Sequence, residues 1–253
     1  GADPVEVAMG AADALAGISR DPAAALVAAR RLVEHHPTNA PLWSVCAHAV
    51  TSMDPYRDVD DLARRIANDA TATNLVDALD GASTICMIGW SGHLVDALAR
   101  RGDIHALVVD SLGDGQDALR YLSRREVSCE LVAPEGLASA AECADATILS
   151  ALAVGNDSVL CAGGSLALAS VAYCVEQPVW MVASEGTRLP DGLFTAMVAG
   201  VRDRPDPWAS GFDVVPHALI TSVFGPTITS GTADTFARMK ACPAADELLR
   251  RSV

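Results

Sequence analysis

Lysine is almost absent from this sequence of 253 residues: Lys240 is the single lysine, and arginine supplies the remaining Lys-plus-Arg charge. Acidic residues outnumber Lys and Arg by 32 to 18, which gives a formal net charge of −14. A phosphate backbone or an anionic membrane surface attracts clustered Lys and Arg. We therefore expect neither nucleic acid nor a membrane as a partner. The scarcity of lysine beside abundant alanine suggests a bacterial, GC-rich genome.

Paired cysteine motifs are also lacking. The seven cysteines form an odd set without C-x-x-C spacing, and the six histidines form no cluster with the spacing of metal ligands. A disulfide framework or a zinc site would need closely or regularly paired cysteines. We expect reduced thiols, no metal and no other cofactor.

The N-terminal residues, GADPVEVAMG, contain neither the basic flank nor the apolar core of a signal peptide. The charge-free run 158–175 approaches the length of a membrane span, but Gly163, Gly164 and Ser165 interrupt it. A cytoplasmic location is expected.

The hydrophobic period changes near residue 80. Residues 4–34 and 41–79 place apolar side chains at helical spacing. From about Gly81, short apolar runs alternate with helical segments, a pattern typical of β/α units. The sequence predicts an α/β fold with a Rossmann-like, doubly wound parallel sheet over 80–253, preceded by a small N-terminal helical domain over 1–79.

The second half carries four more specific expectations. The run 158–183 predicts a strand, a helix and a strand of one parallel sheet. Segment 190–210, rich in Pro and Asp, predicts a long surface connection. Residues 212–224 predict a last strand region, and 232–251 a C-terminal helix.

Polar residues follow three of the predicted strands. They are Gly89-Trp90-Ser91-Gly92, Gly163-Gly164-Ser165, and a loop that contains Glu185 and Arg188. Ligands of such sheets bind beyond the carboxyl ends of the strands. The first two stretches lead directly into helices, whose free N–H groups favour an anion such as phosphate. The alternative is that these glycines only permit tight turns.

Asp110 ends the second predicted strand, where dinucleotide-binding proteins hold a ribose with an acidic side chain. Their G-x-G-x-x-G motif is missing, because Gly89, Ser91 and Leu94 occupy the glycine positions. A nicotinamide dinucleotide is therefore disfavoured. Asp110 stays a candidate ligand contact, as does Trp90, whose ring could stack on a base or sugar.

A family resemblance connects these stretches. The sequence contains, in order, HPTNAPLW (36–43), STICMIGWSGHLVDAL (83–98), DATILSALAVGNDSVLCAGGSLALASVAYCVEQPVWMVAS (145–184) and FDVVPHALIT (212–221). In these it resembles the family of translation initiation factor 2B regulatory subunits, methylthioribose-1-phosphate isomerase and ribose-1,5-bisphosphate isomerase. The resemblance implies a homodimer that holds a phosphorylated sugar or a nucleotide at the strand ends, with Gly163-Gly164-Ser165 in the ligand loop.

The chain differs from the isomerases of this family at the positions of their catalytic residues. The resemblance implies a cysteine after the first strand and an aspartate after the fourth, and here Gly89 and Ala151 stand at those positions. Cys161 and Asp157 are weak substitutes, since a thiol within an apolar run is typically buried and inert.

Three functions stay open from the sequence. The first is a regulatory relative that binds a phosphorylated ribose derivative or a nucleotide without isomerase chemistry. The second is an enzyme with altered chemistry on such a ligand. The third is a structural subunit of an oligomer.

Overall fold

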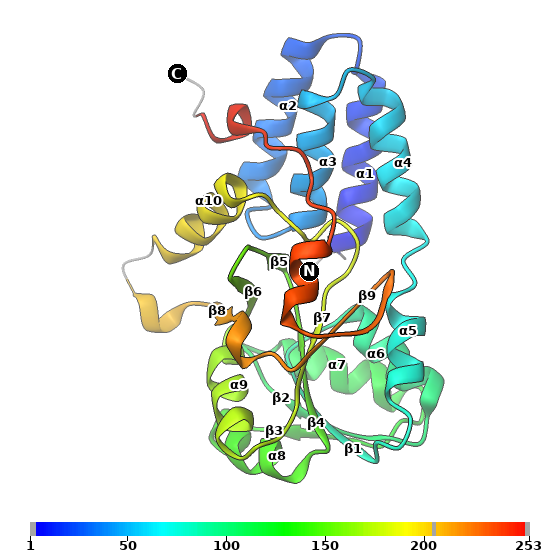
Figure 1. Ribbon diagram of the computed structural model, residues 1–253, viewed down its shortest axis with the longest axis vertical. Helices are drawn as coiled ribbons and strands as arrows, with labels where there is room; N and C mark the ends of the chain where they lie inside the picture. The colour runs from blue at the N-terminus through cyan, green and yellow to red at the C-terminus, as the bar shows by residue number, and fades with distance from the viewer. Residues whose placement is uncertain (1–3, 204–205, 251–253) are drawn as a thin grey trace.

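The computed structural model describes residues 4–203 and 206–250 and shows a layer of helices standing on an α/β unit (Figure 1). The α-helices are α1 (Pro4–Gly17), α2 (Pro22–His35), α3 (Ala40–Thr51), α4 (Pro55–Ala67), α5 (Thr71–Ala78), α6 (Gly92–Arg101), α7 (Asp114–Ser123), α8 (Leu137–Cys143), α9 (Ser165–Cys174) and α10 (Asp191–Arg202). The strands are β1 (Thr84–Ile88), β2 (His105–Val109), β3 (Cys129–Val132), β4 (Ala146–Ser150), β5 (Ala153–Val154), β6 (Ser158–Ala162), β7 (Val179–Val182), β8 (Phe212–Pro216), β9 (Ser222–Gly225) and β10 (Ile228–Gly231).

Capped turns divide the two predicted helical stretches into α1 to α5. Helices α2, α3 and α4 each have proline at the first or second position, preceded by Asp21, Asn39 and Asp54. Each of these side chains accepts hydrogen bonds from N–H groups of the first helical turn. A polar cap followed by proline starts a new helix, because proline fixes φ and lacks the N–H that would need a partner.

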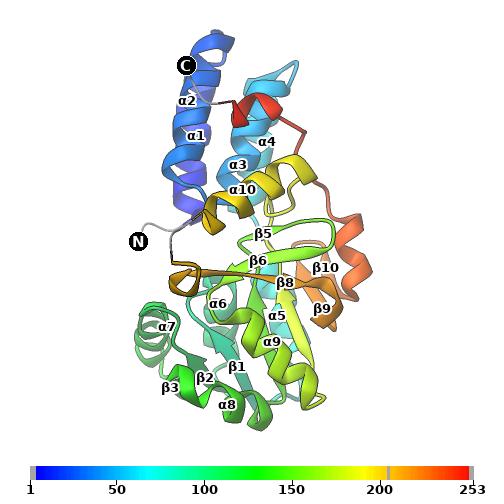
Figure 2. The same cartoon turned by 90° about the vertical axis from the view of Figure 1, so that its left-hand side faces the viewer.

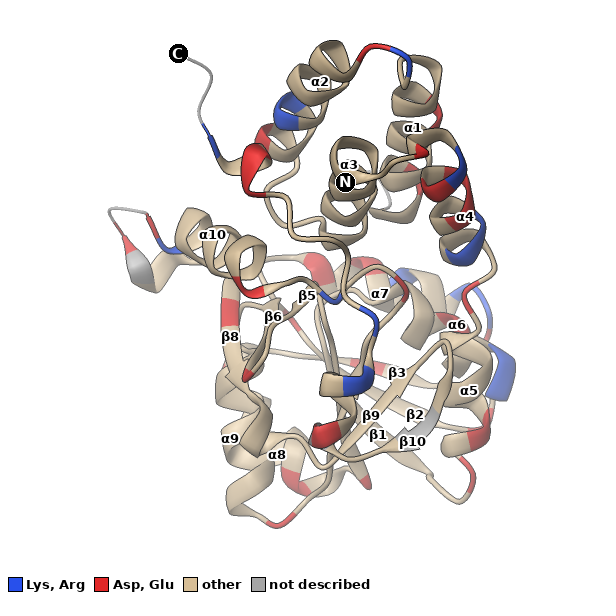
Figure 3. Cartoon of the chain, turned by 45° about the horizontal axis from the view of Figure 1, so that its top comes forward, with Lys and Arg blue, Asp and Glu red and all other residues tan. Residues whose placement is uncertain are grey.

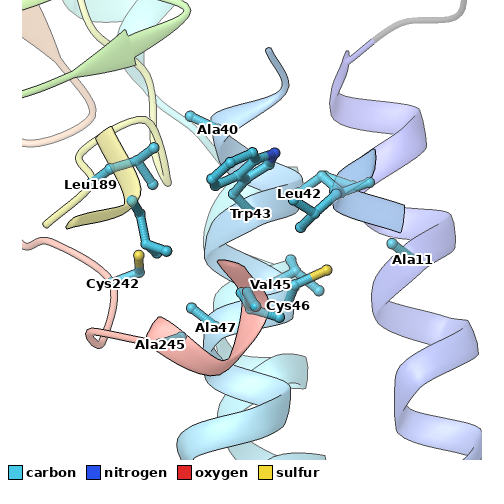
Figure 4. Packing of buried hydrophobic residues seen from close by; sticks show 14 of the residues in the cluster. Ala11, Ala40, Leu42, Trp43, Val45, Cys46, Ala47, Leu189, Cys242 and Ala245 are labelled. Atoms are coloured by element: carbon cyan, nitrogen blue, oxygen red, sulfur yellow. The ribbon is translucent and has the colours of Figure 1, made fainter. Parts of the chain in front are cut away.

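The helical layer shares one apolar core with segments that are distant in the sequence. Buried residues of α1 to α4 pack with buried residues of β5, β6, α10 and the 3-10 turn Asp246–Leu249. Figure 4 shows Leu189, Cys242 and Ala245 beside helix α3 in this cluster. The last segment of the chain is therefore anchored on the helical layer.

Within the described residues, six parallel strands form the main sheet in the order β9-β7-β4-β1-β2-β3, and β10 pairs antiparallel with β9 at the edge. This arrangement confirms the predicted α/β class. The strand order reverses between β1 and β4, which is the switch point where such sheets open a crevice. Helix α5, inside the stretch predicted as the helical domain, contacts α6, β9 and β10. The division at residues 79 and 80 stays a prediction.

A second sheet corrects the expectation for 158–183. Strand β6 pairs antiparallel with β5 and β8, and only β7 joins the main sheet (Figure 2). The predicted strand region 212–224 divides in the same way, because β8 lies in the small sheet and β9 in the large one. A short apolar run fits either kind of sheet, so the sequence pattern could not assign its partners.

Two further expectations are wrong. Segment 190–210 contains the helix α10, which buries Leu193, Phe194, Met197 and Val201 on one face. Residues 232–251 form 3-10 turns at Ala233–Arg238 and Asp246–Leu249 where an α-helix was expected, and residue 251 lies outside the described residues. Pro243 between the turns cannot donate a helical hydrogen bond.

Candidate functional site at the carboxyl edge of the sheet

Two serines meet at the switch point. Ser150 ends β4, and Ser91 is the residue before α6, in the short loop that follows β1. Their hydroxyl groups are hydrogen-bonded to one another. Ser91 is 7% exposed, so this contact ties β1 to β4 at the position where the topology would open a crevice.

The glycine-rich stretch after β1 approaches the neighbouring loop closely. Gly89 has φ of +63°, and a Cβ on it would lie 3.4 Å from the Cβ of Ser111 and 3.6 Å from that of Ala162. Gly92 begins α6. Trp90 is 39% exposed and packs edge-on against Tyr121 of α7 at 5.4 Å between ring centroids. Trp90 thus has a packing role here, and its stacking on a ligand stays a prediction.

Asp110 holds the turn that leads into α7. Its Oδ2 accepts a hydrogen bond from the N–H of Gly113 at 3.1 Å, and its Oδ1 accepts one from that of Gly115 at 3.0 Å. Both carboxylate oxygens therefore have backbone partners. A contact of Asp110 with a ribose stays a prediction.

The N-terminus of α9 already has an anionic partner. Asp213 on β8 accepts hydrogen bonds from the N–H groups of Gly164 at 2.8 Å and Leu166 at 3.0 Å. The N–H of Gly163 donates to the carbonyl of Gly211 at 2.8 Å. Ser165 is buried at 1% exposure. The carboxylate of Asp213 thus occupies the place that the sequence offers to a phosphate.

The two weak catalytic candidates lie at opposite ends of β6. Cys161 is fully buried, and this burial, reinforced by the neighbouring charge of Asp213, raises the pKa of its thiol. A thiol of this kind stays protonated and is not a nucleophile. Asp157 lies in the turn before β6, where its carboxylate accepts a hydrogen bond from the Ser158 hydroxyl at 2.9 Å. The structure does not bring these two residues together.

Glu185 and Arg188 follow β7 and face a different region. Glu185 Oε1 accepts a hydrogen bond from Arg65 Nε of α4 at 2.8 Å, and the Glu185 N–H donates to Asp69 at 2.7 Å. Arg188 donates to the carbonyl groups of Val154 and Leu189 at 3.2 and 2.8 Å.

Arg188 is therefore remote from the loop at Gly163. Its partner Val154 pairs with Val159 near the start of β6, while Gly163 follows the far end of that strand. Four residues of strand span about 13 Å. The structure thus separates two groups of predicted site residues, one around Gly89, Ser91 and Gly163 and the other around Glu185 and Arg188.

The second group lines a cavity of about 540 Å³ between the end of α4, the loop after β7 and the stretch from the β9–β10 turn to Lys240. Its lining residues are Arg65, Ser184, Glu185, Gly186, Arg188, Pro226, Thr227, Ile228, Thr235, Arg238, Met239 and Lys240. Figure 3 shows basic residues of the C-terminal stretch below the helical layer. We call this space the basic cavity.

Sequence reasoning named Arg188 but missed Asp213 and the other three cations of the basic cavity, Arg65, Arg238 and Lys240. Asp213 lies within the FDVVPHALIT stretch, but only the fold brings it to α9. Arg65 belongs to the Arg64-Arg65 pair of α4, and charged pairs on a helix face are ordinarily solvated. Arg64 fits that expectation, since it pairs with Asp60 across the surface of α4, whereas Arg65 reaches Glu185. Adjacent residues of a helix point in different directions, so Arg64 stays on the outer surface of α4 while Arg65 faces the loop after β7.

No group of His, Cys, Asp or Glu within the described residues is arranged to hold a metal ion. In the same part of the chain, no helix is long and apolar enough to cross a bilayer.

Neither a protein-family model nor a curated protein sequence matches the chain. Solved structures do match it. The Pyrococcus horikoshii OT3 translation initiation factor eIF-2B aligns with a TM-score of 0.71 at 15% identity, covering 89% of this chain and 92% of that chain. The eIF2B beta subunit from Chaetomium thermophilum aligns with a TM-score of 0.69 at 15% identity, covering 94% of this chain and 84% of that chain.

A chain of the tetrameric eIF2B-beta2-delta2 complex from C. thermophilum aligns with a TM-score of 0.71 at 14% identity, covering 93% of this chain and 88% of that chain. The chain therefore has the fold of eIF2B proteins, and the family resemblance read from its motifs is confirmed at the level of the fold.

Proposed function

We propose that this chain is an eIF2B-like protein that binds a phosphorylated ribose derivative or a nucleotide at the carboxyl edge of its sheet and lacks aldose–ketose isomerase activity. Fold likeness alone does not establish a function, so the site must carry the proposal. The carrying observation is the chemistry of the strand ends, where proton-transferring groups are missing and the loop after β7 lines the basic cavity.

Isomerisation between the first two carbons of a sugar needs a base and an acid within hydrogen-bond reach of the substrate. Gly89 and Ala151 offer neither group at the two positions where the resemblance implies them. The nearby thiol of Cys161 is buried and protonated, and Ser91 and Ser150 are engaged with one another. These neutral, occupied groups support the absence of isomerase activity.

The test combines binding with turnover. Purified protein is heated with AMP, GMP, ribose 1,5-bisphosphate or methylthioribose 1-phosphate, and each sugar phosphate is followed by NMR for conversion to the ketose. At 100 times its Kd, a ligand stabilises the fold by about 2.7 kcal/mol, which raises the Tm of a chain of this size by about 5–10 °C. We expect such a rise with at least one compound and no conversion.

Conversion at ordinary enzyme rates would show instead an enzyme with altered chemistry. Without a response to any of the four compounds, the structural-subunit alternative would be favoured. In that case the assembly itself is the function to be measured.

We further propose a homodimer in the cytoplasm. The support for assembly is that one structure of the same fold is described as a beta2-delta2 tetramer. Light scattering coupled to gel filtration at micromolar concentration should give twice the mass of 26.2 kDa. A purely monomeric peak would contradict the dimer.

A further inference from the structure

Arg188 is a buried cation without an anionic partner. The residue is 9% exposed, and its guanidinium donates only to neutral acceptors: the carbonyl groups of Val154 and Leu189 and the side-chain oxygen of Asn156. Its Nε atom is buried and has no hydrogen-bond partner among the described residues. Within the same residues, no carboxylate lies within ion-pair distance of Arg188.

An unpaired buried guanidinium is unfavourable unless something compensates its charge. Burial lowers the pKa of Arg188 below its ordinary value, and Asp191 and Cys242 offset this only in part. Such a group commonly marks a site that is completed by a ligand.

The basic cavity is lined mainly by positively charged residues, although the protein as a whole is negatively charged. Arg65, Arg188, Arg238 and Lys240 line it, and Glu185 is the one acid in the lining. The lining therefore carries a formal net charge of +3, from four cations and one carboxylate, in a chain of −14. Among the described residues, this is a concentration of positive potential that would draw in an anion.

The walls of the cavity are fixed before any ligand arrives. The Ser44 hydroxyl donates to the carbonyl of Gly186 at 2.6 Å, and the Thr187 hydroxyl donates to that of Ser184 at 2.6 Å. The Cys242 N–H donates to the carbonyl of Arg188 at 3.3 Å. Cys242 is buried against the helical layer, so Lys240 is held only two residues away from an anchored position (Figure 4).

We propose that the basic cavity is a phosphate-binding site, in which Arg188, Arg65 and Lys240 bind the phosphoryl group of a phosphate monoester. Guanidinium groups match the oxygen atoms of a phosphate in a bidentate way, and lysine adds a point charge. Glu185 Oε1 is held by Arg65, so its second oxygen can accept a hydrogen bond from a ligand hydroxyl. The hydroxyl groups of Thr227 and Thr235 supply further polar contacts.

The phosphate site deepens the proposed function. It rests on that function only for the part of the ligand that carries the phosphate, a ribose derivative or a nucleotide. It moves the phosphate from the N-terminus of α9, where Asp213 already accepts the N–H groups, to the region beyond β7 and β9.

The test uses the full chain, isothermal titration calorimetry and two probes, inorganic phosphate and AMP, at low ionic strength because salt screens exposed charges. Arg65→Ala and Lys240→Ala should each weaken phosphate binding at least tenfold, and the double variant should abolish it. Arg64→Ala is the matched control, since Arg64 is the adjacent arginine of α4 and pairs with Asp60 and Asp61 on the outer surface. It should bind phosphate as the wild type does.

Two more variants separate a binding role from a structural one. Glu185→Gln removes the one negative charge of the lining and should tighten phosphate binding. Arg188→Met removes the unpaired charge together with the hydrogen bonds to Val154, Leu189 and Asn156, so it should melt lower than the wild type without phosphate. If Arg188 binds phosphate, the variant should also lose the rise in Tm that phosphate gives, which a purely structural role would not predict.

Phosphate binding that is equal in the wild type and in the Arg65→Ala/Lys240→Ala double variant would overturn the inference, even if ribose phosphates bind elsewhere. Phosphate binding that depends on Arg65 and Lys240 supports it, even if none of the four ribose compounds binds. In that second case the proposed function fails and the site stands.

Discussion

The carboxylate of Asp213 accepts the N–H of Gly164 at 2.8 Å, across 49 residues of sequence. The same oxygen also accepts the N–H of Leu166. A strand of the small sheet therefore caps a helix that follows another strand of that sheet, with a side-chain anion at the positive end of the helix dipole. At Gly163-Gly164-Ser165 the free N–H groups of the helix therefore bind a side chain of the same protein.

Replacement of Asp213 tests this cap. Asp213→Ala should lower the free energy of unfolding by about 1–2 kcal/mol, the usual cost of losing a helix cap. Urea denaturation measures this change. Asp157→Ala is the control, because Asp157 lies in an exposed turn and its carboxylate bonds only the adjacent Ser158 hydroxyl among the described residues.

Removal of Asp213 should also free the N–H groups of Gly164 and Leu166 for an anion. If the loop only turns the chain, Asp213→Ala gains no phosphate-dependent rise in Tm over the wild type. A gain would show that the predicted phosphate loop is competent but blocked by the protein's own carboxylate.

Gly164 is required by backbone conformation. Its φ is +92°, and a Cβ on it would lie 2.7 Å from Cδ1 of Ile88. Gly164→Ala should destabilise the fold by about 1–2 kcal/mol, with or without phosphate, because an L-residue is strained in the left-handed region. Gly200→Ala is the matched control, since Gly200 lies in α10 with nothing within 4 Å of its added Cβ. It should be neutral or slightly stabilising.

The sequence predicts those features that depend on neighbours along the chain. The change of hydrophobic period near residue 80 marks the start of the β/α units. The Asp-Pro pairs at Asp21 and Asp54 are local signals of helix starts too, although the sequence analysis took 4–34 and 41–79 as undivided helical stretches. Local pattern and local capping determine both kinds of feature, so a single sequence contains them.

Features made by distant segments could not be predicted in this way. No pattern of neighbouring residues indicates that β6 pairs with β8, or that Asp213 reaches α9. The basic cavity is assembled from α4, the loop after β7 and the C-terminal stretch, so its charge is invisible in a sequence whose net charge is −14. The sequence analysis grouped Arg188 with the loops at Gly89 and Gly163, whereas the fold places it in the basic cavity with Arg65 and Lys240.

His217 should make the fold sensitive to mild acid. Its ring stacks on Phe236 at 4.2 Å, and its Nε2 is buried without a hydrogen-bond partner within the described residues. Burial lowers the pKa of His217 below its ordinary value of 6.5, and the charge of Arg188 adds to the effect. The unfolded chain therefore binds a proton more readily than the folded chain, and stability falls as pH drops below about 6.5.

His217→Phe removes this proton uptake. Between pH 7.5 and pH 5.5 the wild type should lose more free energy of unfolding than the variant, by up to about 1.4 kcal/mol per pH unit. Urea denaturation at the two pH values measures the difference. Equal losses would mean that other groups carry the acid sensitivity.

Asp145 should contribute stability that is present at neutral pH and lost in stronger acid. Its Oδ2 accepts hydrogen bonds from the N–H of Ser83 at 2.8 Å, the Ser83 hydroxyl at 2.9 Å and the N–H of Thr84 at 2.9 Å, which joins the starts of β1 and β4. These bonds, first that from Thr84, lower the pKa of Asp145 below its ordinary value of 3.8. The folded state thus holds the charged form more strongly than the unfolded state does. The stabilisation is full above the unfolded pKa and disappears as pH falls through the lower, folded pKa.

Asp145→Asn should therefore cost stability at pH 7, and this cost should shrink as the pH falls below the ordinary pKa of 3.8. The carboxylate is exposed to solvent, so we expect no more than about 1 kcal/mol at pH 7. Asp13→Asn, on the exposed side of α1, is the control and should change little at either pH. A difference between wild type and Asp145→Asn that stays constant from pH 7 to pH 3 would show that the shape of the side chain, and not its charge, joins the two strands.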